Sequence, residues 1–212
     1  GVNHNGSIEL SKKLIDVACE AGADAVKFQK FKAENLVSKD AQKADYQKRN
    51  MRDKDDNQFQ MLLDLELSEE DHIELLDYCN RKNVAFFSTA FDVDGLSYLD
   101  SLGLNIFKVP SGEITNYPYL RKLAEIGKPV ILSTGMSDLI DIEKALEVLE
   151  QGIGRSMITI LHCNTEYPTP MKDVNLKAMS TIESYFNTSV GYSDHTMGIE
   201  IPIAAVAMGA RV

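Results

Sequence analysis

The stretch "IFKVPSGEITNYPYLRKLAEIGKPVILSTG", Ile106–Gly135, contains a complete strand–helix–strand pattern. An apolar run rich in Val, Ile and Phe precedes a segment with apolar residues at three- and four-residue spacing, and a second apolar run follows. Asn116 and Pro118 are typical of a helix start, and Gly127 is typical of a helix end. A helix between two short apolar strands predicts a parallel strand pair covered by that helix.

The same alternation extends along the chain in both directions. Six strands are predicted: Ala25–Gln29, Val84–Ala90, Ile106–Glu113, Pro129–Gly135, Met157–Asn164 and Thr188–His195. The expected caps of the intervening helices are Ser7, Ser68, Asn116 and Ser137, and the expected left-handed glycines after helices are Gly22, Gly127 and Gly152. Repeated βα units of this kind fit either an open doubly wound sheet or a closed eight-stranded barrel.

Polar residues at the carboxyl ends of the strands favour the barrel. They are Lys27 and Gln29, Ser88 and Thr89, Lys108 with Ser111 and Glu113, Ser133 and Thr134, His162 and Asn164, and Ser193 with Asp194 and His195. In a (β/α)8 TIM barrel all such ends open on one face and converge on one pocket. No G-x-G-x-x-G or G-K-[ST] loop follows a strand, which weakens a nucleotide-binding sheet. We therefore expect an α/β barrel, with residues 1–212 forming one catalytic domain.

Composition restricts the possible partners. The chain has 212 residues, a formal net charge of -10 and a pI near 4.9, which disfavours nucleic acid and anionic membranes as ligands. It has no apolar run of roughly 18 residues and no signal-like start, so we expect a cytoplasmic protein without a membrane partner. Its three cysteines are widely spaced and predict neither disulfides nor a zinc site, and we expect Cys19 and Cys79 to be buried.

Two lysines lie inside apolar strands, at Lys27 and Lys108. Such a lysine is costly to bury unless it is paired or faces a polar cavity. Either lysine alone fits an ion pair in a barrel interior. Together with the hydroxyls of Thr89, Ser111 and Ser133, the two lysines predict a cage for an anion such as phosphate or a carboxylate.

Three other segments allow a functional and a structural interpretation. His195 fits a metal ligand, an acid or base, or a helix cap. The hydrophilic stretch Lys39–Gln60 fits a lid or substrate wall as well as a solvated insertion. "YPTP", Tyr167–Pro170, fits a pocket wall or a stiff connection, and "NHNGS", Asn3–Ser7, has the composition of a simple turn.

Taken together, "GVNHNGS", "AVKFQ", "FFSTAFD", "FKVPSGEITNYP", "ILSTGM", "LHCNTEYPTP" and "VGYSDHT" resemble motifs of the N-acetylneuraminate synthase family, which includes the legionaminate and pseudaminate synthases. The resemblance covers practically the whole chain. It implies a (β/α)8 barrel that condenses phosphoenolpyruvate with an N-acetylated amino sugar, typically N-acetylmannosamine. The products are inorganic phosphate and a 2-keto acid.

The resemblance also implies roles for individual residues. Those matching the phosphoenolpyruvate site are Lys27, Thr89, Lys108, Ser111, Ser133 and Ser193. Gln29 and Tyr167 match residues at the sugar side. Asn164 and Thr165, in the same loop as Tyr167, are also expected to bind substrate. Thr165 stands where some family members have asparagine. His195 matches one of two histidines that hold a divalent metal, commonly manganese, with magnesium or cobalt as alternatives. Lys27, Lys108 and His195 are the expected catalytic residues, and Asp194 is expected to orient the loop or the imidazole.

Some family features have no counterpart here. The family carries a glutamate just before the equivalent of Gly1, a second metal histidine after the equivalent of Val212, and a C-terminal antifreeze-like domain that reaches across a homodimer. We therefore expect a barrel truncated at strand one and before strand eight. We also expect the 212-residue chain to be inactive or poorly folded on its own.

Alternative functions remain open at this point. Legionaminate or pseudaminate synthesis would use the same reaction with a diacetylated six-deoxy amino sugar. A non-catalytic sugar- or phosphate-binding barrel would keep the anion cage without turnover. A lyase acting through a Schiff base would use Lys108 or Lys27 as its nucleophile.

Overall fold

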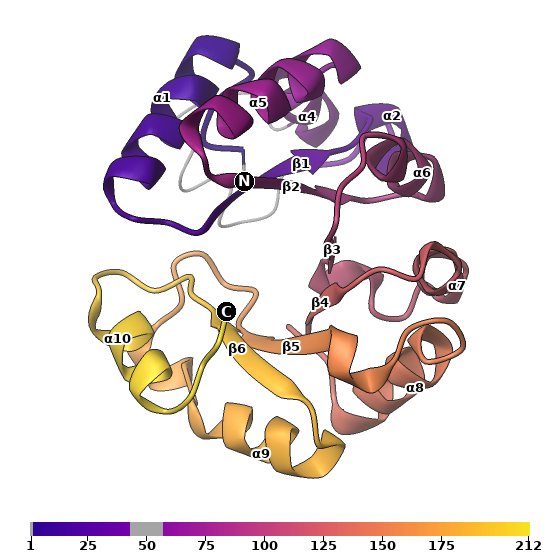
Figure 1. The fold of residues 1–212 in the computed structure, drawn as a ribbon, viewed down its shortest axis with the longest axis vertical. Coiled ribbons are helices and arrows are strands. Elements are labelled where there is room, and N and C mark those ends of the chain that lie inside the picture. Colours follow the sequence, from indigo (N-terminus) through magenta and orange to yellow (C-terminus); the bar gives the residue numbers. More distant parts are fainter. Residues whose placement is uncertain (1, 43–56) are drawn as a thin grey trace. The chain divides into compact units, whose positions relative to one another are not determined.

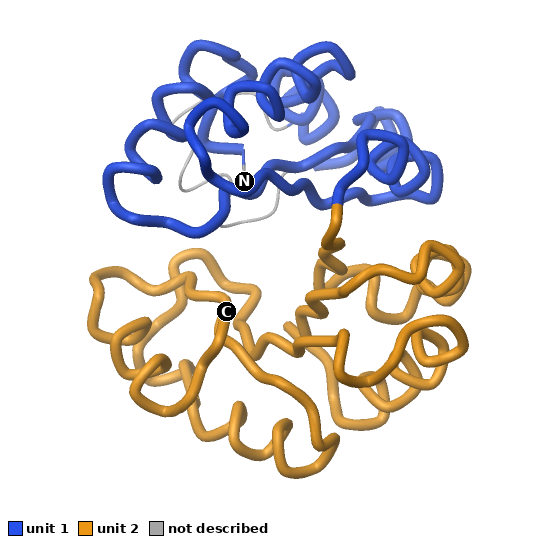
Figure 2. The backbone as a smooth tube through the Cα atoms, in the orientation of Figure 1, with its two compact units in different colours: residues 1–104 blue, residues 105–212 orange. Residues whose placement is uncertain are grey.

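The computed structural model describes residues 2–42 and 57–212. The chain divides into two compact units, residues 1–104 and residues 105–212 (Figure 2). Every pairing between the described strands is parallel, and a helix follows each strand, so the α/β class with parallel sheets is confirmed. Most of the hydrophilic stretch Lys39–Gln60 lies outside the described residues.

The first unit contains a two-stranded parallel sheet (Figure 1). Its strands are β1 (Ala25–Lys30) and β2 (Ala85–Ala90), and Ala25 pairs with Ala85 at one end of the ladder while Lys30 pairs with Ala90 at the other. Its helices are α1 (Ile8–Glu20), α2 (Ala33–Leu36), α4 (Gln58–Leu65), α5 (Glu69–Lys82) and α6 (Val93–Ser101). α1 packs against α5, and both α5 and α6 pack against β2.

The two faces of this small sheet differ in chemistry, because side chains alternate along a strand. Phe28 and Phe86 lie on the face covered by helices, where their rings stack 5.7 Å apart. His72 of α5 meets the edge of Phe86 at 6.5 Å. Lys27, Gln29 and Thr89 therefore share the opposite face, and Gln29 and Thr89 are direct partners in the ladder.

The second unit contains a four-stranded parallel sheet in the order β3-β4-β5-β6. Its strands are β3 (Phe107–Val109), β4 (Val130–Ser133), β5 (Ile158–Cys163) and β6 (Ser189–Ser193). The helices are α7 (Tyr117–Ile126), α8 (Leu139–Leu149), α9 (Lys177–Phe186) and α10 (Glu200–Ala207), with short 3-10 turns η1 (Ser111–Glu113), η2 (Arg155–Met157) and η3 (Met171–Asp173). After α10 the chain runs along β6, where Arg211 N donates to Val190 O at 3.0 Å and Tyr192 N donates to Val212 O at 2.9 Å.

The core of this unit lies between the sheet and the helices that cover it. Alternate strand residues such as Val109, Leu132, Ile160 and Val190 are buried on this face. In Figure 1, α7, α8 and α9 follow one another along the outside of the curved sheet. The other face of the same strands is the one that carries Lys108 and Ser133.

The predicted helix starts are largely confirmed. Ser7, Ser68 and Asn116 each cap the expected helix with a side-chain oxygen. The prediction of Ser137 as a helix cap is wrong, because the next residue, Asp138, caps α8 instead. Asp138 accepts the Asp141 N–H at 2.9 Å, and the Asp141 carboxylate accepts the Asp138 N–H at 3.2 Å, which completes a capping box.

The predicted glycine ends are confirmed at two of three positions. Gly22 (φ 78°) and Gly127 (φ 71°) adopt the left-handed conformation. Gly152 does not, because α8 ends at Leu149. Gly152 is required for another reason: a Cβ at this position would overlap the backbone carbonyl of Ala124.

The sequence also predicted the state of the three cysteines and the absence of a membrane-spanning helix. All three cysteines lie among the described residues and are free thiols. Cys79 and Cys163 are buried, but Cys19 is only half-buried, so the prediction for Cys19 is wrong. In the part of the chain that the structure describes, no helix has the length and apolar character needed to cross a membrane.

Candidate functional site

Lys108 is the central cation of the candidate site in the second unit. Its residue is only 7 % exposed, and its Nζ donates to Val109 O at 2.7 Å and to Ser133 Oγ at 2.5 Å. The β3–β4 register aligns Lys108 with Ile131, two residues before Ser133, so Lys108 and Ser133 share one face of the sheet. These two acceptors are neutral, and both contacts orient the ammonium group.

Ser111 lies just beyond β3, where Pro110 ends the strand and η1 begins. Its Oγ accepts the N–H of Gly135 at 2.9 Å and lies 3.4 Å from Cys163 Sγ. A Cβ on Gly135 would lie 2.6 Å from Thr165 Cγ2 and 2.9 Å from Ser111 Oγ. The loops after β3, β4 and β5 therefore meet at Gly135, and only a glycine fits there.

Ser193 and His195 lie where β6 ends. Ser193 is the ladder partner of Cys163, so it faces the same side as Lys108. His195 Nδ1 lies 2.6 Å from the carbonyl oxygen of Asn164. A carbonyl only accepts, so Nδ1 carries a proton, and in the neutral imidazole Nε2 keeps a lone pair. Ser193 Oγ lies 3.4 Å from this Nε2 and donates to it when the imidazole is neutral.

The loop after β5 holds His195 in place at three points. Asn164 accepts from Nδ1, the Tyr167 ring lies 4.1 Å from the imidazole, and Thr169 N donates to His195 O at 2.8 Å. Tyr167 is 42 % exposed, and its role as the wall of a pocket stays a prediction. The side-chain amide of Asn164 donates to Asp173 O at 2.8 Å, and its role in substrate binding stays a prediction.

The geometry of His195 suits one metal ligand. A metal-binding histidine commonly donates its other ring N–H to a carbonyl, as Nδ1 does here. Among the described residues, however, no group of three or more His, Cys, Asp or Glu side chains is placed to hold a metal ion. Asp194 orients the loop rather than the imidazole, because its Oδ1 accepts from Thr196 N at 3.0 Å and from Thr196 Oγ1 at 2.8 Å.

Three of the polar strand-end residues do not face the site. The expectation that all of them converge is wrong for His162, Thr134 and Ser88, because strand side chains alternate between faces. His162 lies on the helix-covered side, with Nε2 2.8 Å from Val174 O and its ring 5.7 Å from that of Tyr192. It lines a cavity of about 490 Å³ beside α8 and α9. Ser88 Oγ lies 3.4 Å from His72 Nε2, behind the sheet of the first unit.

In the first unit, Lys27, Gln29 and Thr89 share the sheet face opposite the helices. Burial lowers the pKa of Lys27. Thr89 is 2 % exposed, and its Oγ1 has no hydrogen-bond partner among the described residues. A buried hydroxyl of this kind is typical of a position that waits for a ligand atom or a water. The convergence of these three side chains with those around Lys108 stays a prediction.

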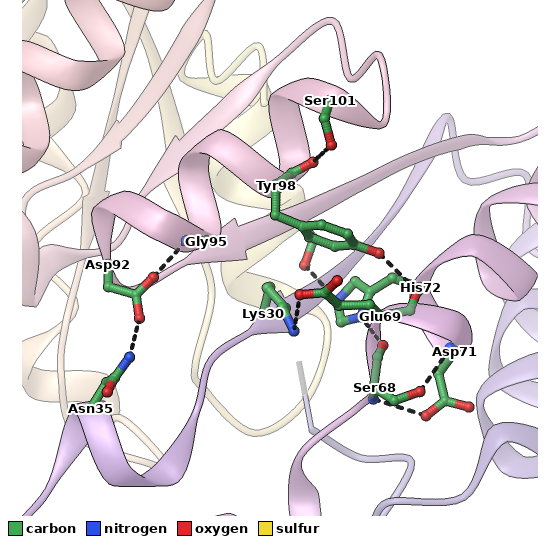
Figure 3. A network of polar contacts seen from close by, with 11 residues as sticks. Lys30, Asn35, Ser68, Glu69, Asp71, His72, Asp92, Gly95, Tyr98 and Ser101 are labelled. Carbon is green, nitrogen blue, oxygen red and sulfur yellow. Dashed lines mark hydrogen bonds and ion pairs between the residues drawn. The ribbon is translucent and has the colours of Figure 1, made fainter.

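Sequence reasoning missed Lys30, the last residue of β1. It is 5 % exposed, and its Nζ lies 3.8 Å from Glu69 Oε1 and 5.2 Å from the centre of the Tyr98 ring (Figure 3). The Tyr98 hydroxyl donates to Glu69 O at 2.7 Å, and burial raises the pKa of Tyr98 to about 12. The sequence could have indicated this position, because Lys30 follows Phe28 by two residues and therefore lies on the same, helix-covered face of the strand.

Sequence reasoning also missed Gly135 and Cys163 as parts of the site. Gly135 ends the "ILSTG" strand pattern, and a glycine directly after a strand often marks a close approach of another group. Cys163 gave no signal beyond its place near the end of a strand, because a buried cysteine usually acts as a small apolar residue.

Comparison with curated proteins shows similarity over the whole chain. It is 54 % identical over 213 residues to the N,N'-diacetyllegionaminic acid synthase of Campylobacter jejuni, and 49 % identical over 215 residues to the protein of that name from Legionella pneumophila. It is 32 % identical to the human N-acetylneuraminate-9-phosphate synthase. The chain is covered completely, but it spans only 64 % and 60 % of the two bacterial relatives.

Solved structures show the same fold. The N-acetylneuraminic acid synthetase of Leptospira borgpetersenii, solved with citrate, has a TM-score of 0.87 and 34 % identity, covering 99 % of this chain and 68 % of that one. The chain also resembles a truncated 3-deoxy-D-arabino-heptulosonate 7-phosphate synthase from Thermotoga maritima, with a TM-score of 0.69 and 16 % identity. The match covers 99 % of this chain and 69 % of that one, and it shows a likeness of fold alone. The model of the NeuB family matches residues 14–212, and the chain therefore belongs to the NeuB family.

Proposed function

We propose that the protein condenses phosphoenolpyruvate with an N-acetylated amino sugar and releases inorganic phosphate. The observation that carries this proposal is the buried ammonium of Lys108 held against Ser133. Ser111 lies just beyond the same strand as Lys108, and Ser193 lies at the end of β6 on the same face of the second unit's sheet. A buried cation in contact with a hydroxyl group is suited to a phosphate or a carboxylate. Membership of a family with sugar-acid synthases supports the choice of reaction.

We propose a closed (β/α)8 barrel as the complete architecture. Parallel strands followed by helices are compatible with it, and so is the likeness to the synthetase from Leptospira borgpetersenii. In such a barrel the sheet faces opposite the helices point inward. Lys27, Gln29 and Thr89 would then contribute to the same interior as Lys108, which is the arrangement that a substrate with two anionic groups requires.

The proposed chemistry assigns a task to each kind of residue. Lys108 and Lys27 would bind the phosphate and carboxylate of phosphoenolpyruvate and fix its orientation. After carbon 3 bonds to the sugar aldehyde, carbon 2 takes up water, and the C–O bond to phosphate breaks. The hydroxyls of Ser111, Ser133 and Ser193 and the lysine charges would stabilise phosphate as its negative charge grows.

We propose that His195 holds a divalent metal through Nε2. We propose manganese, with magnesium and cobalt as alternatives. A bound divalent ion supplies a Lewis acid that polarises a carbonyl. Two residues of this chain orient the imidazole of His195: the carbonyl of Asn164 accepts from its protonated nitrogen, and the Tyr167 ring lies beside it.

The relatives favour a diacetylated six-deoxy amino sugar as the second substrate. Two legionaminic acid synthases are 54 % and 49 % identical to the chain, whereas the human N-acetylneuraminate-9-phosphate synthase is 32 % identical and a Campylobacter jejuni pseudaminic acid synthase is 30 % identical. We therefore place legionaminate-type synthesis ahead of N-acetylmannosamine condensation.

Bond cleavage can be tested with phosphoenolpyruvate labelled with ¹⁸O at the bridging oxygen. Cleavage between carbon and oxygen leaves the label in the released phosphate, and mass spectrometry of that phosphate measures it. Label retained in the organic product would contradict the proposed mechanism. A covalent adduct trapped by borohydride on Lys108 or Lys27 would instead support the Schiff-base lyase.

A further inference from the structure

Cys163 makes a contact that the proposed chemistry leaves unused. It is the last residue of β5, it is 6 % exposed, and it is the ladder partner of Ser193. Its Sγ lies 3.4 Å from Ser111 Oγ. At the end of β5 the thiol therefore contacts the hydroxyl of Ser111, and Cys163 also lines the cavity beside α8 and α9.

The hydroxyl of Ser111 has a limited set of hydrogen bonds. A serine oxygen accepts at two lone pairs and donates one proton. The Gly135 N–H, at 2.9 Å, fills one lone pair. If the thiol of Cys163 donates to the second, the Ser111 proton points away from both of these groups and is available to a bound anion.

The thiol also lets this proton change direction at little cost. Sulfur is a weak acceptor and S–H a weak donor, so either O–H···S or S–H···O is held loosely. An anionic oxygen is a much stronger acceptor than a thiol sulfur. An arriving phosphate would therefore draw the Ser111 proton toward itself, and the Cys163 proton would turn to occupy the lone pair left behind.

We infer that Cys163 is a positioning residue that aims the Ser111 hydroxyl at the bound phosphoenolpyruvate. This inference rests on the proposed function, and it adds a specific contributor to anion affinity. Cys163 acts through Ser111 and touches no reacting atom. Its effect is therefore confined to the phosphoenolpyruvate side of the reaction.

A double-mutant cycle tests this role in the full-length protein that contains the chain. Calorimetric titration with inorganic phosphate and with phosphoenolpyruvate gives the affinities of the wild type, Cys163→Ala, Ser111→Ala and the double variant. We expect Cys163→Ala to weaken anion binding about fivefold to tenfold, the range of one neutral hydrogen bond. In the Ser111→Ala background the same substitution should have no further effect.

Two further variants separate positioning from packing. Cys163→Ser keeps a donor and should restore most of the affinity, and Cys19→Ala, a half-buried cysteine on α1, should change nothing. In turnover assays, Cys163→Ala should raise KM for phosphoenolpyruvate and leave KM for the sugar unchanged. If the affinity losses of Cys163→Ala and Ser111→Ala multiply in the double variant, the inference about Cys163 is overturned and the proposed function is not affected. A wild type that binds neither phosphate nor phosphoenolpyruvate would overturn the proposed function and the inference with it.

Discussion

At the scale of single residues, the chemistry of the site follows from a charged side chain in an apolar strand. Lys108 is buried, and its ammonium group donates to Val109 O and Ser133 Oγ. The sequence was sufficient to single out Lys108 with Ser111 and Ser133. It was not sufficient for the contact of Cys163 with Ser111 or for that of Lys30 with Glu69, since each joins elements far apart along the chain.

Replacing Lys108 by glutamine should remove the charge while keeping most of the side-chain volume. We expect kcat/KM for phosphoenolpyruvate to fall by at least about 100-fold, because preorganised groups at a developing charge typically contribute this much. Lys122→Gln, on the surface of α7 and ion-paired with Glu125 at 3.9 Å, is the matched control. Equal kcat/KM in wild type and Lys108→Gln would contradict the role of Lys108.

His72 makes stability depend on pH. It is fully buried, and its pKa lies below the usual 6.5, first because burial disfavours the charged imidazole and also because Lys30 is near. The pKa of His72 is raised, to a smaller extent, by hydrogen bonds to the backbone of Ser68 and Gln29 and by the charge of Asp71. As pH falls below 6.5, the unfolded chain binds a proton that the folded chain resists, so the free energy of unfolding decreases.

Urea unfolding between pH 5 and pH 8 measures this effect. The wild type should lose stability on acidification with a slope of at most about 1.4 kcal/mol per pH unit from this group. His72→Gln should show a smaller slope, whatever its absolute stability. An unchanged slope in His72→Gln would show that His72 does not titrate as described.

At the scale of elements, the sequence predicted the order of strands and helices well and their ends less well. Caps such as Ser68 are local, so the sequence contains all the groups that form them. The strand predicted over Ile106–Glu113 ends at Val109, because Pro110 cannot continue the ladder and Ser111 starts a 3-10 turn. Gly152 was misread for a different reason: its neighbour Ala124 belongs to another helix.

Gly152→Ala tests the close approach between α7 and the chain after α8. A Cβ would meet the Ala124 carbonyl, and we expect a loss of about 1–3 kcal/mol in the free energy of unfolding. Gly154→Ala is the control, because its φ is -67° and the nearest atom to an added Cβ is 3.9 Å away. Gly154→Ala should be neutral or slightly stabilising. Two variants of equal stability would refute the contact.

At the scale of the whole molecule, two compact units each carry part of the predicted set of residues. One sheet face holds Lys27, Gln29 and Thr89, and another holds Lys108, Ser133 and Ser193. The sequence pattern alone does not bring the two sets together, because the convergence of strand ends depends on the closure of a barrel. That closure and a homodimer remain predictions.

The most direct measurement is the release of inorganic phosphate from phosphoenolpyruvate by the full-length protein with manganese. The second substrate is a diacetylated six-deoxy amino sugar, N-acetylmannosamine or no sugar. We predict release that requires a sugar and is fastest with the diacetylated one. Faster release with N-acetylmannosamine would correct the choice of sugar and leave the reaction in place. No release with any sugar would contradict the synthase, and it would leave the residues around Lys108 as an anion-binding site without turnover.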